Sequence, residues 1–223
     1  MMKRDSLVAY GSPLDKRQSL SEPTGLPNRD LSNPAYTITN AAGSSGRQAG
    51  HWLGDNVADW AHYLISIAEI LNSVPMVGSD GCGYAGVTNE LLCARWATLG
   101  AFSPFYRNHE GSGEPPHEFY RYPITAEAAR NTIATRYQVL SYFYTAFYDQ
   151  NQSGVPCVQP MFFVYPEDPN ANALQYQYFY GRAIMVAPVT VENSTTTEIY
   201  MPDDVFYDYY TYETFRGTGN MVT

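Results

Sequence analysis

The hydrophobic positions follow a helical period between about residues 57 and 153 and a strand period after residue 154. In the first part, apolar residues recur every three to four positions, as on the buried face of an amphipathic helix. In the second part, short apolar runs alternate with turn sequences rich in Pro, Asp and Asn, which is typical of strands. The pattern predicts helices at 57–73, 88–99 and 125–149 and strands at 157–164, 176–189, 197–201 and 205–212.

Two further apolar runs, 74–78 and 101–105, lie between the predicted helices and read as short buried strands. Asp80 follows the first run and His109 follows the second. In βα-barrel enzymes, the active site is built from polar residues at the carboxyl ends of the strands. Asp55 lies where a loop becomes the first helix, so it is either an N-cap or a carboxylate with a chemical role.

These patterns predict an α/β fold, with the C-terminal part of a (β/α)8 TIM barrel followed by an all-β sandwich. We expect the barrel region at 49–153, with its last helix ending at about 150, and an incomplete β-sandwich domain at 154–223. Residues 1–48 show neither period and are rich in Ser, Pro, Gly and Asn. They are predicted to be irregular and disordered.

Composition narrows the possible ligands. The chain holds 20 Tyr, 10 Phe and 3 Trp, so that aromatic residues reach 15%, which suits stacking on sugar rings as well as an aromatic core. The net charge of −9 argues against a nucleic-acid partner, because binding to phosphates needs clustered Lys and Arg. No apolar run is long enough to cross a bilayer, and the N-terminus shows no signal peptide, so no membrane association is predicted.

The three Cys residues do not form a zinc pattern and allow at most one disulfide with one free thiol. No metal site and no cofactor are predicted. Two Asn-x-Ser/Thr sequons begin at Asn151 and Asn193. They are compatible with a protein of the secretory route and, with the Cys count, favour an oxidising compartment.

Several longer strings occur in a fixed order along the chain. They are Gly50-His51-Trp52-Leu53-Gly54-Asp55-Asn56, Met76-Val77-Gly78-Ser79-Asp80-Gly81-Cys82-Gly83-Tyr84, Glu90-Leu91-Leu92-Cys93-Ala94-Arg95-Trp96 and Pro104-Phe105-Tyr106-Arg107-Asn108-His109. In these strings the sequence resembles glycoside hydrolase family 31, and within it the fungal α-glucosidases. The resemblance covers roughly residues 49–223 and implies a retaining enzyme that acts on terminal α-linked glucose of maltose-like oligosaccharides.

The resemblance also implies residue roles. Asp55 corresponds to the general acid/base, and Asp80 and His109 to hydrogen-bond partners of the sugar hydroxyls. Trp52 and Tyr84 correspond to aromatic walls of the glucose pocket, where reduced solvent access would help to keep Asp55 protonated. Cys82 and Cys93 correspond to a family disulfide.

One part of the family pattern is missing. The nucleophile of the family lies in a Trp-x-Asp-Met-Asn-Glu strand, and no such string occurs in this sequence. A retaining glycosidase needs two carboxyl groups, so we expect this chain to be a fragment that hydrolyses nothing alone. A truncated product, a mis-joined gene, a pseudoenzyme or a non-catalytic carbohydrate-binding remnant would each explain the sequence. The family implies a secreted or secretory-pathway location.

Overall fold

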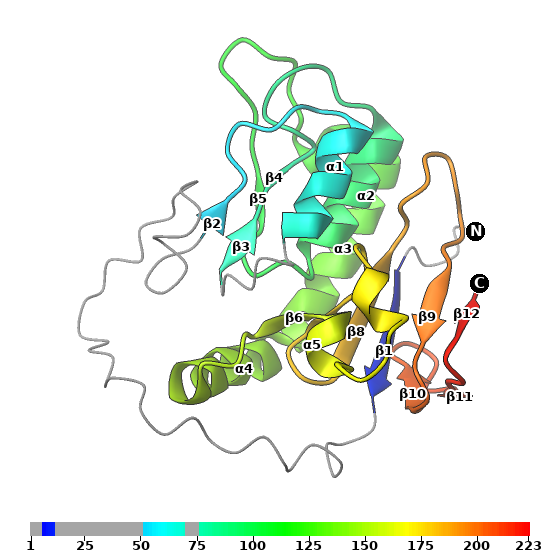
Figure 1. The fold of residues 1–223 in the computed structure, drawn as a ribbon. Helices are drawn as coiled ribbons and strands as arrows, with labels where there is room; N and C mark the ends of the chain where they lie inside the picture. The colour runs from blue at the N-terminus through cyan, green and yellow to red at the C-terminus, as the bar shows by residue number, and fades with distance from the viewer. Residues whose placement is uncertain (1–5, 12–50, 70–75) are drawn as a thin grey trace.

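The protein was analysed as a computed structural model, which describes residues 6–11, 51–69 and 76–223. Three helices, α1, α2 and α3, stand side by side, and α4 continues from the end of α3 toward the lower left of Figure 1. An antiparallel sheet lies beside these helices. The helices are α1 Trp60–Ala68, α2 Glu90–Gly100, α3 Pro123–Gln138, α4 Leu140–Ser153 and the short α5 Met161–Val164.

Four short strands alternate with the first two helices: β2 (His51–Trp52), β3 (Val77–Gly78), β4 (Asp80–Gly81) and β5 (Arg107–Asn108). The pairs β2–β3 and β4–β5 are both parallel. Parallel strands joined through helices are the repeating unit of a βα-barrel. The α/β fold class is therefore confirmed.

The strand predicted at 101–105 is wrong, because the chain turns there and the strand begins only at Arg107. Arg136 on α3 explains the turn. Its guanidinium donates to the carbonyl oxygens of Ala101 at 2.9 Å, Ser103 at 2.6 Å and Pro104 at 2.9 Å. These bonds hold the turn against α3, and the chain reaches β3 only at Phe105, whose amide donates to the backbone oxygen of Val77 at 3.0 Å.

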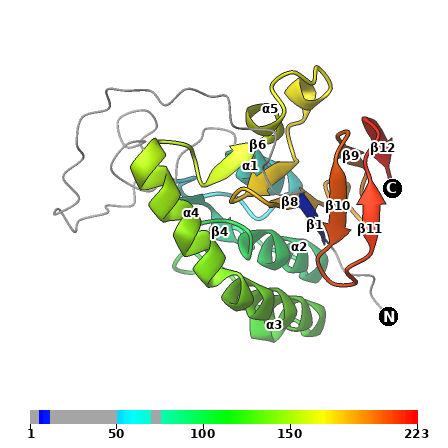
Figure 2. The same cartoon turned by 90° about the horizontal axis from the view of Figure 1, so that it is seen from below.

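The strands after α4, together with the N-terminal β1, form a six-stranded antiparallel sheet in the order β11-β10-β1-β8-β7-β6 and a two-stranded sheet of β9 and β12. Figure 2 shows α5 on one side of this sheet and α2, α3 and α4 on the other. The strands are β1 Ser6–Gly11, β6 Val158–Pro160, β7 Tyr178–Tyr180, β8 Ile184–Pro188, β9 Ile199–Met201, β10 Val205–Asp208, β11 Thr214–Arg216 and β12 Asn220–Val222.

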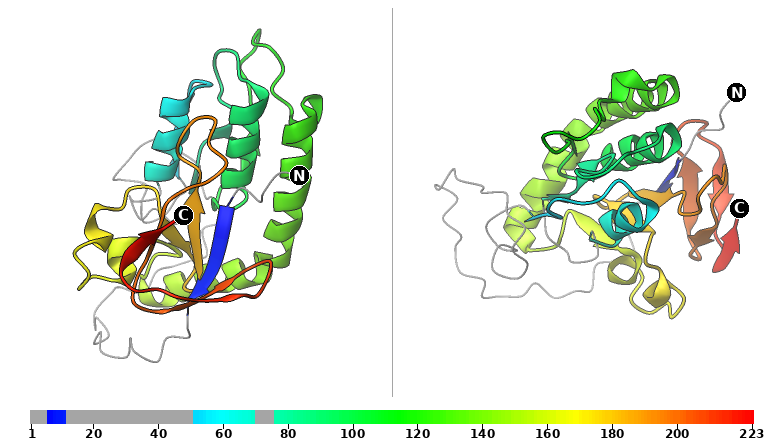
Figure 3. Two further views of the ribbon diagram at one scale, coloured as in Figure 1. Left: turned by 90° about the vertical axis from the view of Figure 1, so that its right-hand side faces the viewer. Right: turned by 90° about the horizontal axis from the view of Figure 1, so that it is seen from above.

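The prediction that residues 1–48 are irregular is wrong for Ser6–Gly11, which forms β1. This strand lies between β8 and β10 and pairs antiparallel with both (Figure 3, left). The partners of β1 come from the far end of the chain, so the local sequence pattern did not reveal it. The other residues of 1–48 lie outside the described residues.

The sheet separates two apolar cores, and alternation along β7 and β8 explains how. Tyr178, Tyr180 and Ile184 face the core that contains α2 and α4. Phe179 and Met185 face a second core with α5 and β9. Since successive side chains of a strand point to opposite faces, strands that are apolar throughout are covered on both sides.

The single helix predicted at 125–149 is two helices that meet at Val139 (φ −95°, ψ 5°). The break changes which residues are buried. Tyr137 and Tyr144 would share the buried face of one continuous helix, because they follow the helical spacing of Ile133 and Leu140, but they are 72% and 77% exposed. Phe143 is buried instead and stacks on Tyr180 with ring centroids 3.7 Å apart.

Candidate active site

The carboxyl ends of the parallel strands carry the residues singled out by the sequence. Trp52 ends β2, Asp80 lies two residues after the end of β3, where β4 begins, and His109 directly follows β5. The strands lie close together at this point: a Cβ added to Gly78 would come within 2.1 Å of the carbonyl oxygen of Phe105. The structure therefore brings three separate sequence segments to one edge.

Asp80 is completely buried and forms an ion pair with Arg107, its partner in the β4–β5 register. Arg107 donates from Nε to Oδ1 at 2.7 Å, and Nη2 donates to the same oxygen. Burial raises the pKa of Asp80, and the hydrogen bonds and charge of Arg107 act in the opposite direction. The other oxygen, Oδ2, accepts no hydrogen bond of standard geometry from the described residues, but a hydrogen bond from the side chain of Trp52 also lowers the pKa of Asp80, so the indole lies close to this carboxyl group.

An aromatic ring covers this ion pair. The guanidinium carbon of Arg107 lies 4.9 Å from the ring centroid of Trp52, which is half-buried. Such a cation–π contact fixes the plane of both groups. The indole Nε1 of Trp52 is buried and makes no hydrogen bond of standard geometry with the described residues; its nearby acceptor is the carboxyl group of Asp80.

Asp55 is exposed to solvent, next to the buried Asn56. The amide of Asn56 donates to the backbone oxygen of Asp80 at 3.0 Å, and its backbone oxygen accepts from the amide of Tyr84 at 2.7 Å. Asp55 is thereby held beside the Asp80 segment. The expected shielding of Asp55 from solvent is not found in this structure.

Asp55 is also not the N-cap of the first helix. That position belongs to Asp59, whose side chain accepts from the amide of His62 at 2.8 Å. The cap was predicted four positions too early because both aspartates precede the apolar stripe. Asp55 consequently has no capping role to explain its presence in the loop.

Tyr84 and His109 lie against each other, with ring centroids 5.2 Å apart and planes inclined by 39°. Both are half-buried. The amide of Gly111 donates to the backbone oxygen of Tyr84 at 2.8 Å, so the loop after β5 is fastened to the turn after β4. The two rings therefore form one wall rather than two independent side chains.

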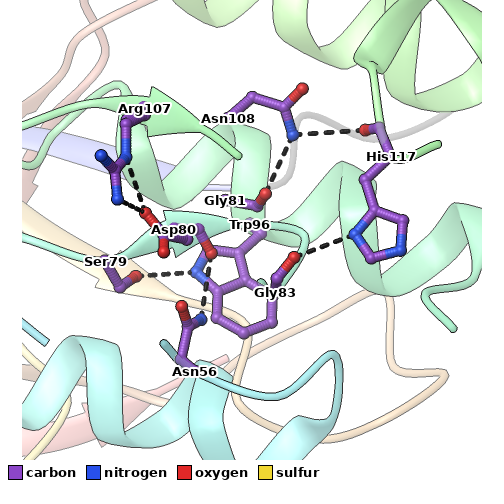
Figure 4. Close-up of polar contacts among 9 residues, drawn as sticks. All are labelled: Asn56, Ser79, Asp80, Gly81, Gly83, Trp96, Arg107, Asn108 and His117. Carbon is purple, nitrogen blue, oxygen red and sulfur yellow. Dashed lines mark hydrogen bonds and ion pairs between the residues drawn. The ribbon is translucent and has the colours of Figure 1, made fainter. Parts of the chain in front are cut away.

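The turn after β4 is held by a disulfide and by hydrogen bonds from Asn108 and His117, and Figure 4 shows the hydrogen bonds. Cys82 and Cys93 form a disulfide, with Cα atoms 4.5 Å apart, that joins the turn to α2. Asn108 donates to the backbone oxygen of Gly81 at 2.9 Å. The imidazole Nδ1 of His117 lies 2.9 Å from the backbone oxygen of Gly83. The turn that carries Tyr84 is fixed from three sides.

Gly83 shows how tightly this turn is built. It has φ +89°, a conformation that side chains disfavour. A Cβ at this position would come within 2.4 Å of the Cα of Ala58. Any other residue here would push the turn away from the loop that follows Asp55.

Two residues of the site were not identified from the sequence. Arg107 was read only as part of a motif, and its role as the partner of Asp80 depends on the β4–β5 register. His117, which is completely buried, belongs to none of the sequence motifs given above. Opposite charges at paired positions of neighbouring strands would have identified Arg107 as the partner of Asp80. That signal can be read only when the register of the two strands is known.

Comparison with known proteins gives the same class of protein as the fold and site, the carbohydrate hydrolases. Residues 17–146 match the TIM-barrel domain of glycosyl hydrolases family 31, and residues 154–223 match the C-terminal domain of that family. The chain belongs to glycosyl hydrolases family 31. The family resemblance drawn from the sequence motifs is therefore confirmed.

Fungal proteins are among its relatives. A probable alpha/beta-glucosidase of Arthroderma benhamiae is 45% identical over 92% of this chain. The probable alpha/beta-glucosidase agdC of Aspergillus clavatus is 48% identical over 98% of it. The chain spans 27% and 25% of the length of these two relatives.

Solved structures share the fold. A crystal structure of glucosidase II alpha subunit in its DNJ-bound form matches 80% of this chain with a TM-score of 0.75 and 32% identity, over 20% of its own length. A cycloalternan-degrading enzyme from Trueperella pyogenes matches 80% of the chain with a TM-score of 0.74 and 25% identity, over 28% of its own length.

Two searches of the described residues gave negative results. No helix in residues 6–11, 51–69 and 76–223 is both long and apolar enough to cross a membrane. Within the same ranges, no group of three or more His, Cys, Asp or Glu side chains is arranged to hold a metal ion.

Proposed function

We propose that this chain supplies the acid/base and glucose-binding part of a retaining α-glucosidase, which removes terminal α-linked glucose from maltose-like oligosaccharides. One observation carries the proposal: the exposed carboxyl group of Asp55 is held, through Asn56, beside the buried Asp80–Arg107 pair. An accessible carboxyl group next to fixed polar groups is what protonation of a bound glycosidic oxygen requires.

In this reaction, Asp55 protonates the oxygen of the bond that breaks and later takes a proton from the attacking water. Asp80 accepts a hydrogen bond from a sugar hydroxyl through Oδ2, while Arg107 holds Oδ1. Trp52 and the Tyr84–His109 wall contact the ring of the sugar. Hydrogen bonds to hydroxyls that strengthen in the oxocarbenium-like transition state lower the barrier.

The nucleophile of the reaction has to come from outside this chain. Retaining enzymes place the second carboxylate ~5 Å from the first, and the family string that carries it does not occur in this sequence. We therefore propose that the chain alone binds glucose without hydrolysing glucosides. The alternative function is a non-catalytic carbohydrate-binding remnant or pseudoenzyme, in which the same residues only hold the sugar.

The first experiment uses the purified chain. Titration calorimetry with glucose and maltose should show binding that Asp80→Asn weakens, and aryl α- and β-glucosides should release no phenol. The β-glucoside is included because the fungal relatives are named alpha/beta-glucosidases. Turnover that disappears in Asp55→Asn would overturn the proposed inactivity, and absence of sugar binding would overturn the glucose site.

The second experiment separates the enzyme from the remnant. Residues 51–223 replace the matching segment of the Aspergillus clavatus relative, and the chimera is assayed with an aryl α-glucoside. Hydrolysis that falls by orders of magnitude in Asp55→Asn, with sugar binding unchanged, supports the acid/base role. A chimera that binds glucose but turns over nothing would favour the remnant.

We also propose that the protein belongs to the secretory route. The Cys82–Cys93 disulfide supports this location, because such bonds persist in oxidising compartments and are rare in the cytosol. Fractionation of cells that produce the protein, with an antibody against it, tests the location. Recovery in the cytosolic fraction with both thiols reduced would contradict it.

A further inference from the structure

We propose that Asn193 is an N-glycosylation site and that Asn151, the other sequon asparagine, is left unmodified. The proposal goes beyond the hydrolytic function and rests on the secretory location proposed above. Both sequons have the sequence Asn-x-Ser/Thr. The structure distinguishes them by exposure, by backbone conformation and by the state of the hydroxyl group.

Asn193 lies in the loop between β8 and β9, the orange loop that rises at the right of Figure 1. Asn193 and Thr195 are both exposed. Between them, the amide of Ser194 donates to the carbonyl oxygen of Val191 at 3.1 Å, which closes a turn. A glycan is bulky and needs a surface loop of this kind.

The loop is also fixed without covering the acceptor. Arg95 on α2 donates to the backbone oxygen of Ser194 at 2.6 Å. The hydroxyl of Ser194 donates to the backbone oxygen of Thr196 at 2.7 Å. These bonds use the residue in the middle of the sequon, so the amide of Asn193 and the hydroxyl of Thr195 stay at the surface.

Asn151 is in a different setting, in the last turn of α4, and is half-buried. On a helix, residues two apart do not face each other, so Asn151 and Ser153 point to different sides. The hydroxyl of Ser153 donates to the backbone oxygen of Asp149 at 2.7 Å and accepts from the amide of Val155 at 3.2 Å. This hydroxyl is engaged in ending the helix.

A purely conformational role for Asn193 has to be weighed. The residue has φ +62°, and asparagine tolerates this left-handed region better than most residues. Aspartate tolerates it as well. The variant Asn193→Asp therefore keeps the turn and removes the amide nitrogen, which separates the two roles.

The covalent step is transfer of an oligosaccharide from a polyprenyl pyrophosphate donor. A bond forms between Nδ2 of Asn193 and the anomeric carbon of the first sugar. The bond between that carbon and the pyrophosphate oxygen breaks, the polyprenyl pyrophosphate leaves with the electron pair, and the amide loses one proton. No oxidant or reductant is needed.

The test is translation of the full 223-residue chain, behind a cleavable signal sequence, with microsomes that carry the lipid-linked donor. Supplying the signal separates the site from the natural location. We expect one mobility step that endoglycosidase removes. Asn193→Asp and Thr195→Ala should abolish it, while Thr195→Ser and the matched Asn151→Asp should retain it.

Peptide mass spectrometry after glycosidase treatment should then find the deamidation tag at Asn193 alone. Signal cleavage without any mobility step would overturn the proposal. So would a step that Asn151→Asp removes, or two steps that show both sites occupied.

Discussion

The site region, residues 51–69 and 76–118, and the β domain, residues 154–223, differ in what their interiors contain. In the β domain, β7 and β8 are apolar on both faces, and the only buried side-chain polar atom there that makes no hydrogen bond of standard geometry with the described residues is the hydroxyl of Tyr180. The site region buries several such atoms, which include Trp52 Nε1, Asn56 Oδ1, Asp80 Oδ2 and His117 Nε2.

The two regions therefore contribute differently to the free energy of unfolding. A buried polar atom without a partner costs about 1–3 kcal/mol, and native proteins keep few of them. The site region therefore carries a larger cost of this kind than the β domain. The apolar burial of the β domain offsets part of that cost. Variants in each region test the comparison.

The largest effect is expected in the β domain. Phe179→Ala should destabilise the chain by about 3–5 kcal/mol. The side chain of Phe179 on β7 is 1% exposed and packs in the core with α5 and β9, so its removal leaves a cavity. Urea unfolding followed by circular dichroism measures the change. Phe215→Ala on β11, at a side chain 42% exposed, is the matched control and should stay within about 0.5 kcal/mol.

The next effect concerns Glu69, at the end of α1, where burial raises the pKa to about 9. Because the folded state holds this proton more tightly than the unfolded one, its contribution is complete below pH 4.5 and is lost as the pH rises to about 9. Glu69→Gln removes the slope and should be more stable at pH 7 by about 3 kcal/mol.

The measurement for Glu69 is the free energy of unfolding between pH 4 and pH 9 for both proteins. Parallel curves would contradict the prediction. They would also show that buried polar groups of the site region cost less than the comparison with the β domain implies.

A smaller loss is expected at the ion pair. Asp80→Ala leaves two donors of Arg107 without their acceptor and should cost about 1–3 kcal/mol, moderated because Arg107 is partly exposed. Asp80→Asn keeps the shape and should cost less. If Asp80→Ala is as stable as the unchanged protein or more stable in urea unfolding, the cost of burying the carboxylate exceeds the stabilisation by its ion pair with Arg107.

The smallest effect on stability is expected at Asp55. Asp55→Asn changes an exposed side chain that caps no helix, so unfolding in urea should shift by less than about 0.5 kcal/mol. A larger shift would show that Asp55 is structural. In the chimera described above, Asp55→Asn should lower the rate of hydrolysis while the free energy of unfolding stays unchanged.

The sequence predicted features that depend on local pattern. Alternation and turn residues identified the strands around Phe179 and Met185, and the helical period identified α1 and α2. The motifs located Asp80 and His109 at strand ends. Features that depend on pairing between distant segments were not predicted, such as the Asp80–Arg107 pair.

The exposed tyrosines of α3 and α4 show a second limit. The apolar stripe continues through Val139 at helical spacing, but the backbone leaves the helix there. Tyr137 and Tyr144 then face solvent, while Phe143 reaches Tyr180. A periodic pattern gives the face of a helix only as long as the helix is continuous.

The place of β1 in the sheet has a consequence for how the chain folds. During synthesis, Ser6–Gly11 is made well before its partners β8 and β10. Contacts between segments far apart in a chain raise its contact order and slow its folding. Until β1 inserts between them, β8 and β10 each have one open edge at which another chain can pair.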